Sequence, residues 1–196
     1  SVYTNQPVAT EIMNRLGPTL LLSLTSCIVA LFIGTMLGIF CARHVGSKLD
    51  TILGSVSYLF DSTPSFWLGL MLILIFSSAL HLFPTSGMVS LRAPATGFGY
   101  VLDVMNHLFL PSLSLSLTLI PYYFRIARTS IIQVMNEDFI TTLRAAGMKE
   151  SKIFKKYVFR NAILPIVTVF GIQLAYIVSG SAIVEIVFSW PGMGSY

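Results

Sequence analysis

Charged residues are what this chain lacks most. Asp, Glu, Lys and Arg make up 10% of its 196 residues, whereas 55% are hydrophobic. Soluble domains carry roughly 25% charged residues. A soluble protein of this size could not hide so much apolar surface from water, so lipid is the expected solvent for much of the chain. The net charge of +4 is therefore attributed to membrane topology, and no nucleic-acid partner is expected.

Cysteine and catalytic motifs are scarce as well. The two cysteines, Cys27 and Cys41, are fourteen residues apart in one predicted helix and cannot meet. No HExxH, Gly-x-Ser-x-Gly or phosphate-binding glycine loop occurs, and the three histidines lie in or beside predicted loops. Asp103 and His107 are four residues apart without a third ligand, which favours a local hydrogen bond over a metal site. We therefore expect neither an enzyme nor a cofactor site.

What the chain does have is long apolar runs. At about 1.5 Å per residue, a helix of some 20 residues crosses the roughly 30 Å hydrocarbon core of a bilayer. The sequence predicts an all-α, polytopic transmembrane helix bundle in residues 18–196, preceded by an external lead-in segment at 1–17. Residues 81–107 are rich in Pro and Gly and are predicted to form an extramembrane loop. Four spans are expected, at about 18–42, 56–80, 108–128 and 162–188.

Small residues recur every four positions in the first predicted span, at Ala30, Gly34 and Gly38. On a helix this spacing places them on one face, where the backbone of a second helix can approach closely. The alternative is that they merely fill gaps.

Polar residues within the spans are candidates for a translocation path. Asp61 either faces a cavity or partner, or caps the helix that follows Pro64; we favour the cap. The hydroxyls of Ser112, Ser114, Ser116 and Thr118 either pack against neighbouring helices or line a polar path. The candidate path residues are Asp61, Ser62, Ser114, Thr118 and Gln173.

The most polar stretch, residues 136–165, holds six of the twelve Lys and Arg residues. Its apolar residues fall at spacings of three and four, as on one face of a helix, and Gly147 interrupts the pattern. Two short amphipathic helices with a turn between them are predicted. They could lie on the membrane surface or fit a groove on a partner protein, and the residues alone leave both open.

Spacing within this stretch resembles a known family. Gly147 is followed by Arg160-Asn161-Ala162-Ile163-Leu164-Pro165, with the proline eighteen residues after the glycine. This resembles the EAA loop of ABC importer permease subunits, in the variant of the dipeptide, oligopeptide and nickel permeases. The general pattern would place Glu-Ala-Ala where this chain has Thr141-Thr142-Leu143. Residues 64–69 and 185–194 also resemble that group.

The resemblance implies a fragment of a six-span permease fold that lacks the first and last helices. It also implies one half of a translocation pathway for peptides or nickel complexes. The loop at 136–160 would then dock on a cytoplasmic ATPase. The implied docking residues are Phe139, Ile140, Leu143, Arg144, Ala145, Ala146, Gly147 and Met148.

Partners and sidedness follow from the same resemblance and from the basic residues. The implied partners are a second permease subunit, identical or different, two ATPase subunits, an external solute-binding protein and membrane lipid. Ten of the twelve basic residues lie on the side of loops 43–50 and 127–161, which predicts that this side is cytoplasmic. Residues 1–17 and 189–196 would then be outside.

Two rival functions are less consistent with the residues. A secondary transporter or channel would place ionisable residues deep in the spans, but Asp61 and Glu185 lie near predicted span ends. The polar loop has no role in that mechanism. A membrane-embedded enzyme would need a base within reach of a nucleophile, which the placement of the histidines does not provide.

Overall fold

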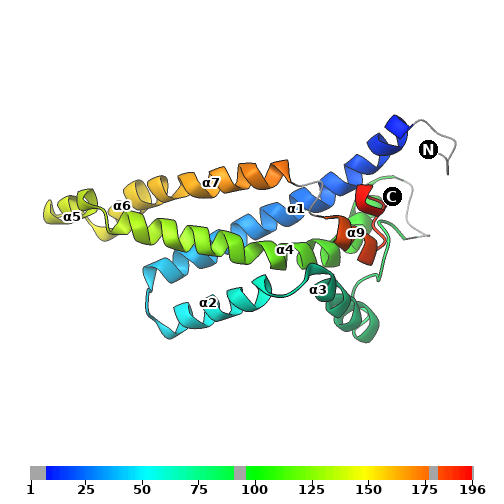
Figure 1. Cartoon of the computed structure of the whole chain (residues 1–196), viewed down its shortest axis with the longest axis horizontal. Helices are drawn as coiled ribbons and strands as arrows, with labels where there is room; N and C mark the ends of the chain where they lie inside the picture. Colours follow the sequence, from blue (N-terminus) through cyan, green and yellow to red (C-terminus); the bar gives the residue numbers. More distant parts are fainter. Residues whose placement is uncertain (1–7, 91–95, 177–180, 196) are drawn as a thin grey trace. The chain divides into compact units, whose positions relative to one another are not determined.

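The computed structural model describes residues 8–90, 96–176 and 181–195, and within these ranges every regular element is helical (Figure 1). This confirms the all-α fold. The elements are α1 (Val8–Arg43), α2 (Lys48–Asp61), α3 (Ser65–Leu72), the π-helical η1 (Ile73–Ala79), α4 (Phe98–Met135), α5 (Asp138–Ala145), α6 (Glu150–Ile153), the π-helical η2 (Phe154–Val158), α7 (Phe159–Ala175), α9 (Ala182–Val187) and the 3₁₀ turn η3 (Met193–Ser195).

Three helical segments are long and apolar enough to cross a membrane: Ala9–Arg43, Phe98–Met135 and Glu150–Ala175. A fourth candidate arises if α2 and Ser65–Ala79 count as one broken span. Pro64 is the N-cap of the second half, as expected from a residue that cannot donate a backbone hydrogen bond.

Two helices begin before the expected spans. α1 starts by Val8 and continues through Pro18, and α4 starts at Phe98, before the expected 108, and continues through Pro111 and Pro121. Long membrane helices tolerate proline inside because other groups satisfy the freed carbonyls.

The expected single span at 162–188 is wrong. α7 ends at Ala175, and α9 is a separate short helix that follows Ser181. Residues 177–180 of that span, like residues 1–7 of the lead-in, lie outside the described residues.

The chain divides into two compact units, to each of which α1 and α4 contribute one part. Unit 1 comprises Ser1–Ile28, Thr63–Thr118 and Leu174–Tyr196, and unit 2 comprises Val29–Ser62 and Leu119–Gln173.

Unit 1 is held together around the residues after α9. The Trp190 side chain is fully buried, and its indole N–H donates to the carbonyl oxygen of Pro18 at 2.9 Å. The carboxylate of Glu185 is also fully buried and accepts hydrogen bonds from the Ser181 hydroxyl (2.8 Å) and the Gly194 amide (2.7 Å). A Cβ added at Gly192 would overlap this carboxylate. Glu185 therefore holds the end of the described chain against α9.

Hydroxyl residues of α4 also pack inside unit 1. Ser114 and Ser116 are fully buried, and their hydroxyls donate to the carbonyl oxygens of Ser65 and Ser26, each at 3.1 Å. For these two residues the packing alternative is confirmed. Their side chains have no exposed surface and their hydroxyls bond to neighbouring backbone, so they cannot line a polar path.

Unit 2 is built on a very close approach of α1 and α4. A Cβ added at Gly34 would lie 2.7 Å from the Cβ of Tyr123, and one at Gly38 would lie 2.7 Å from the Cβ of Ala127. Ala30 is fully buried. The spacing of small residues therefore does what the sequence predicted: it allows two helix backbones to come into contact.

Candidate functional site

The polar loop forms two short helices, α5 and α6, which lie together at one end of unit 2 (Figure 1). Gly147 separates them with φ +76°, a left-handed conformation in which glycine carries no Cβ penalty. The Gly147 amide donates to the Arg144 carbonyl and the Met148 amide to the Leu143 carbonyl, so the last turn of α5 is closed. Arg144 pairs with Glu150 across the turn at 2.7 Å. The predicted pair of short helices with a turn between them is confirmed.

A buried apolar cluster joins this loop to the membrane helices, and we call it the loop core. It draws on α1, α4, α5, α6, η2 and α7, so the loop is fixed to the long helices and not tethered by a flexible linker. α6 in turn continues through η2 into α7 without an intervening turn. The buried members of the loop core are Ala42, Ile131, Ile140, Ile153, Val158 and Ala162.

The structure corrects one docking residue. Ile140 was expected to project toward a partner, but its side chain has 0% exposure inside the loop core. Leu143 and Met148 are half-buried against the same cluster. An amphipathic helix of eight residues has one apolar stripe, and the sequence cannot tell whether that stripe faces the chain's own core or another protein.

A different part of the loop remains available for contacts outside the chain. The Phe139 side chain is 41% exposed, and Ala145, Ala146 and Gly147 are exposed around the turn. The Arg144 side chain is also exposed, although Glu150 engages it. These residues form a surface with one aromatic side chain and a small-residue turn, which we call the turn surface.

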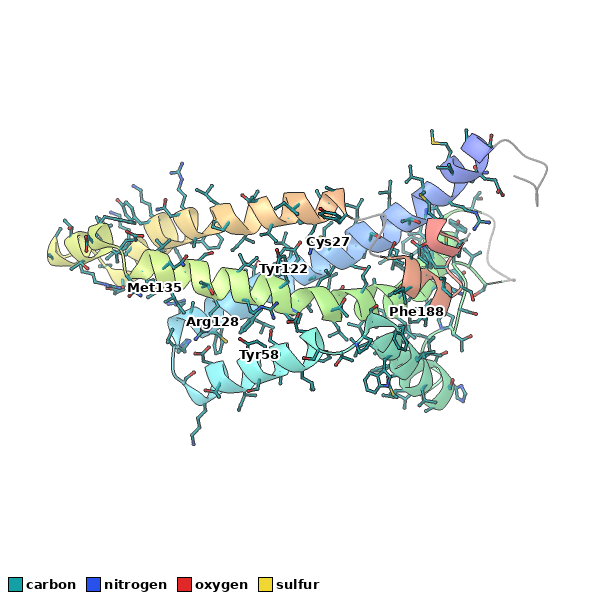
Figure 2. All side chains as sticks on the ribbon, in the orientation of Figure 1. Cys27, Tyr58, Tyr122, Arg128, Met135 and Phe188 are labelled. Carbon is teal, nitrogen blue, oxygen red and sulfur yellow. The ribbon has the colours of Figure 1, made fainter. Side chains whose placement is uncertain are left out.

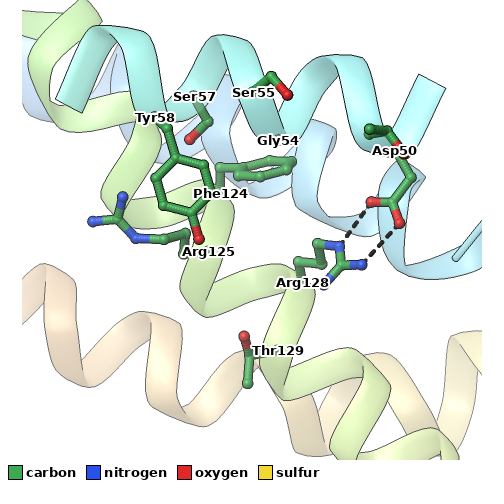
Figure 3. A pocket seen from close by; sticks show the side chains of 10 residues that line it. Asp50, Gly54, Ser55, Ser57, Tyr58, Phe124, Arg125, Arg128 and Thr129 are labelled. Carbon is green, nitrogen blue, oxygen red and sulfur yellow. Dashed lines mark hydrogen bonds and ion pairs between the residues drawn. The ribbon is translucent and has the colours of Figure 1, made fainter. Parts of the chain in front are cut away.

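A second polar region lies between α2 and α4. The Arg128 Nε and Nη2 atoms donate to the two oxygens of Asp50, each at 2.8 Å (Figure 3). The Asp50 side chain is 8% exposed and also accepts a hydrogen bond from the Gly46 amide. The Asp50–Arg128 pair ties the first turn of α2 to α4. Figure 2 labels Arg128 of α4 and Tyr58 of α2.

The other end of α2 is tied to α4 by Asp61, and this corrects the expected helix cap. The Arg125 Nη1 atom donates to the Asp61 carboxylate at 2.7 Å. Pro64, the N-cap residue of α3, makes no side-chain capping hydrogen bond. The Asp61 side chain is 42% exposed and that of Arg125 is 35% exposed. In the sequence, Arg125 and Arg128 count only toward membrane topology. Two arginines three residues apart on one helix, each with an aspartate available, were the signal for these ion pairs.

Beside the Asp50–Arg128 pair lies a pocket of about 430 Å³, which Arg125 also lines (Figure 3). The Ser57 hydroxyl oxygen is buried and, within the described part of the chain, has no hydrogen-bond partner. The lining includes Arg125 and Arg128 from α4 and Asp50, Ser55, Ser57 and Tyr58 from α2.

The remaining candidate path residues are placed as follows. Ser62 is exposed and donates to the Tyr58 carbonyl. Thr118 is half-buried and donates to the Leu115 carbonyl, and Gln173 is half-buried.

Asp103 and His107 form the expected local hydrogen bond, between the His107 ring and the Asp103 carbonyl at 2.9 Å. Within residues 8–90, 96–176 and 181–195, no group of three His, Cys, Asp or Glu side chains could hold a metal ion.

The two ion pairs should differ in their contribution to stability. We expect Arg128→Gln to lower the melting temperature of the purified protein far more than Arg125→Gln. Removing one partner of a buried pair costs about 3–5 kcal/mol because the other charge stays buried, whereas exposed pairs contribute about 0–1 kcal/mol. The measurement is thermal unfolding in detergent of both variants side by side. Equal shifts would contradict the assigned burial of Asp50.

Comparison with known proteins identifies the family of this chain. Residues 34–196 match the family described as binding-protein-dependent transport system inner membrane component. The chain belongs to this family. The resemblance noted in the sequence is thereby confirmed, and with it a multi-pass membrane protein of a transport family.

Three relatives of this family member are transport permeases. The chain is 39% identical over 193 residues to the oligopeptide transport system permease protein AppB of Bacillus subtilis, covering 98% of this chain and 60% of that protein. It is 34% identical over 210 residues to the di/tripeptide transport system permease protein DppB of Pseudomonas aeruginosa (100% and 62%). It is 36% identical over 194 residues to the glutathione transport system permease protein GsiC of Escherichia coli (99% and 59%). The chain thus spans about 60% of the length of these relatives.

Solved structures show the same fold at low sequence identity. The methionine ABC transporter MetNI in inward-facing conformations superposes with a TM-score of 0.72 at 17% identity, covering 98% of this chain and 81% of that one. An amino acid ABC transporter with histidines gives a TM-score of 0.63 at 18% identity, covering 95% and 76%. The helical fold of this family member is therefore that of ABC transporter membrane subunits.

Proposed function

We propose that this chain forms part of a permease subunit of an ATP-driven ABC importer for peptides and contributes half of the translocation pathway. Family membership supports the transport role, and the names of the relatives support peptides as cargo in preference to nickel complexes. A secondary transporter or channel is not favoured, because the family's description names a binding-protein-dependent system.

The turn surface is the proposed docking site for a cytoplasmic ATPase subunit. The observation that carries this proposal is the loop core: it buries one face of α5 and α6 against α1, α4 and α7 and leaves Phe139 exposed. A contact made at Phe139 would therefore act on the long helices directly. This is what an importer needs if ATP-driven movements are to reach the membrane pathway.

The proposed assembly contains a second permease subunit, identical or different, two ATPase subunits and an external solute-binding protein. Leu164, Val167 and Ile172 are exposed along α7 and would contact lipid or the second permease subunit. Asp61, Ser62, Thr118 and Gln173 are proposed to face the path.

The function is tested by reconstituting the complete transporter in liposomes and measuring uptake of radiolabelled alanyl-alanine. Uptake should require both internal ATP and the external binding protein. Uptake that proceeds without ATP would indicate a secondary transporter instead.

The loop carrying α5 and α6 is proposed to be cytoplasmic because ten of the twelve basic residues share its side. We expect a cysteine at Lys152 to react with an impermeant thiol reagent only from the cytoplasm, and one at Thr96 only from outside. Both positions are exposed, and the native Cys27 and Cys41 are buried, so their background labelling should be low. The reverse pattern at either position would overturn the orientation and the docking proposal with it.

A further inference from the structure

The pocket between α2 and α4 contrasts with the contact between α1 and α4 in the same unit. Where α1 meets α4, a Cβ at Gly34 or Gly38 would have no room. Between α2 and α4 there is instead a space of about 430 Å³, lined by hydroxyls and charged groups. The space is open to the surface of the chain, since Thr51, Ser55 and Thr129 in its lining are exposed, so water or a ligand can enter it.

One polar group of α2 at this pocket has no partner inside the described chain. Ser57 is 8% exposed, and its hydroxyl oxygen has no hydrogen-bond partner within the described residues. Gly54 lies one turn earlier on α2, and no atom lies within 4 Å of the place its Cβ would occupy, so there is room at this face. The unpartnered Ser57 hydroxyl points to a group that approaches this face of α2 from outside the chain.

The charges indicate which group that is. Arg125 lines the pocket and holds the Asp61 carboxylate through two nitrogens, at 2.7 and 3.4 Å. The Asp61 carboxylate thus shows that this guanidinium can bind a carboxylate here. The pair is partly exposed, so an incoming carboxylate can replace Asp61 at low cost, whereas Asp50 holds Arg128 in a buried pair. Once displaced, Asp61 would be free to accept an ammonium group.

We infer that this pocket is a binding subsite for the carboxylate terminus of a transported peptide, with Arg125 as its ligand and Asp61 as the group it displaces. The inference rests on the proposed function and deepens it: the solute is a peptide with a free carboxylate, recognised inside the permease itself. Gly54 leaves room for the peptide backbone, and the Ser57 hydroxyl supplies an unused hydrogen-bonding group.

The test uses the complete transporter in lipid nanodiscs, without the binding protein, and follows thiol modification of Gly54→Cys by a negatively charged methanethiosulfonate. Gly171→Cys is the matched control, because it is another helix-interior glycine with nothing within 4 Å of its Cβ position. We expect alanyl-alanine at about ten times its Kd to slow modification of Gly54→Cys about tenfold, because only the unoccupied fraction reacts. Alanyl-alanine amide, which lacks the carboxylate, should not protect, and Arg125→Gln should remove the protection. The control should not respond to either compound.

Three results would overturn the inference. The first is equal protection by the peptide and its amide, and the second is protection that survives Arg125→Gln. The third is slower modification of Gly54→Cys, without peptide, in phosphatidylglycerol nanodiscs than in phosphatidylcholine nanodiscs. The last would identify a lipid phosphate as the occupant. Thr129→Cys, at an exposed lining position, repeats the test if Gly54→Cys does not assemble. Uptake of alanyl-alanine by the wild-type transporter is measured in parallel. Absent uptake refutes the proposed function, whereas uptake without protection refutes only this subsite.

Discussion

Replacing Phe139 by aspartate is expected to abolish ATP-driven uptake while the permease stays in the membrane at its normal level. The ring is 41% exposed on α5, so the chain loses little when it is removed. An aromatic anchor buried at a protein contact costs about 2 kcal/mol or more when truncated. A carboxylate in its place would be desolvated without a partner, which adds to the loss. The measurements are uptake, membrane level and co-purification of the ATPase subunits.

Two neighbours on α5 serve as controls for this result. Thr141→Asp introduces the same charge at an exposed position of the same helix, away from Phe139, and should retain most uptake. Ile140→Asp places the charge in the loop core, where the side chain has 0% exposure, and should lower the membrane level itself. Near-normal uptake by Phe139→Asp at equal membrane level would leave the turn surface without a docking role.

Substituting valine for Gly38 should have the largest effect on folding. A Cβ there would lie 2.7 Å from both the Ala127 Cβ and the Phe124 carbonyl oxygen, and backbone cannot move aside as a flexible side chain can. Overpacking of this kind typically costs about 1–3 kcal/mol, and here α1 and α4 must separate along their contact. We expect a strongly reduced amount of protein in the membrane and a lowered melting temperature in detergent.

Gly171→Val is the matched control for Gly38→Val, because it also lies inside a long helix but faces open space. It should change the melting temperature by no more than the difference in helix propensity, below about 1 kcal/mol. If the two variants behaved alike, the close α1–α4 contact would not be a determinant of stability.

Several elements could be predicted from the sequence because they depend on local chemistry. The low charge and long apolar runs determined a helical membrane protein, since only helices and closed barrels satisfy backbone hydrogen bonds in lipid. The repeat of Ala30, Gly34 and Gly38 predicted a close helix contact. Gly147 predicted the turn between α5 and α6, because glycine adopts a left-handed conformation without a Cβ penalty.

Other features could not be predicted because they depend on which side chains meet across the fold. Asp61 was expected to cap a helix but pairs with Arg125, 64 residues away. Glu185 was assigned to a span end but is fully buried beneath the chain that follows it. α1 and α4 begin before the expected spans and pass through proline, and α7 ends earlier than its apolar pattern.

The sequence by itself determined the solvent, the helical class, the family and the position of the polar loop, because composition, period and motif spacing are properties of the chain alone. Only the tertiary structure decided which face of α5 is free. Ile140 and Phe139 are adjacent apolar residues, and one is buried in the loop core while the other is exposed. The pocket beside Arg125 also became visible only there, because a space between helices is created by residues far apart in sequence that fail to fill it.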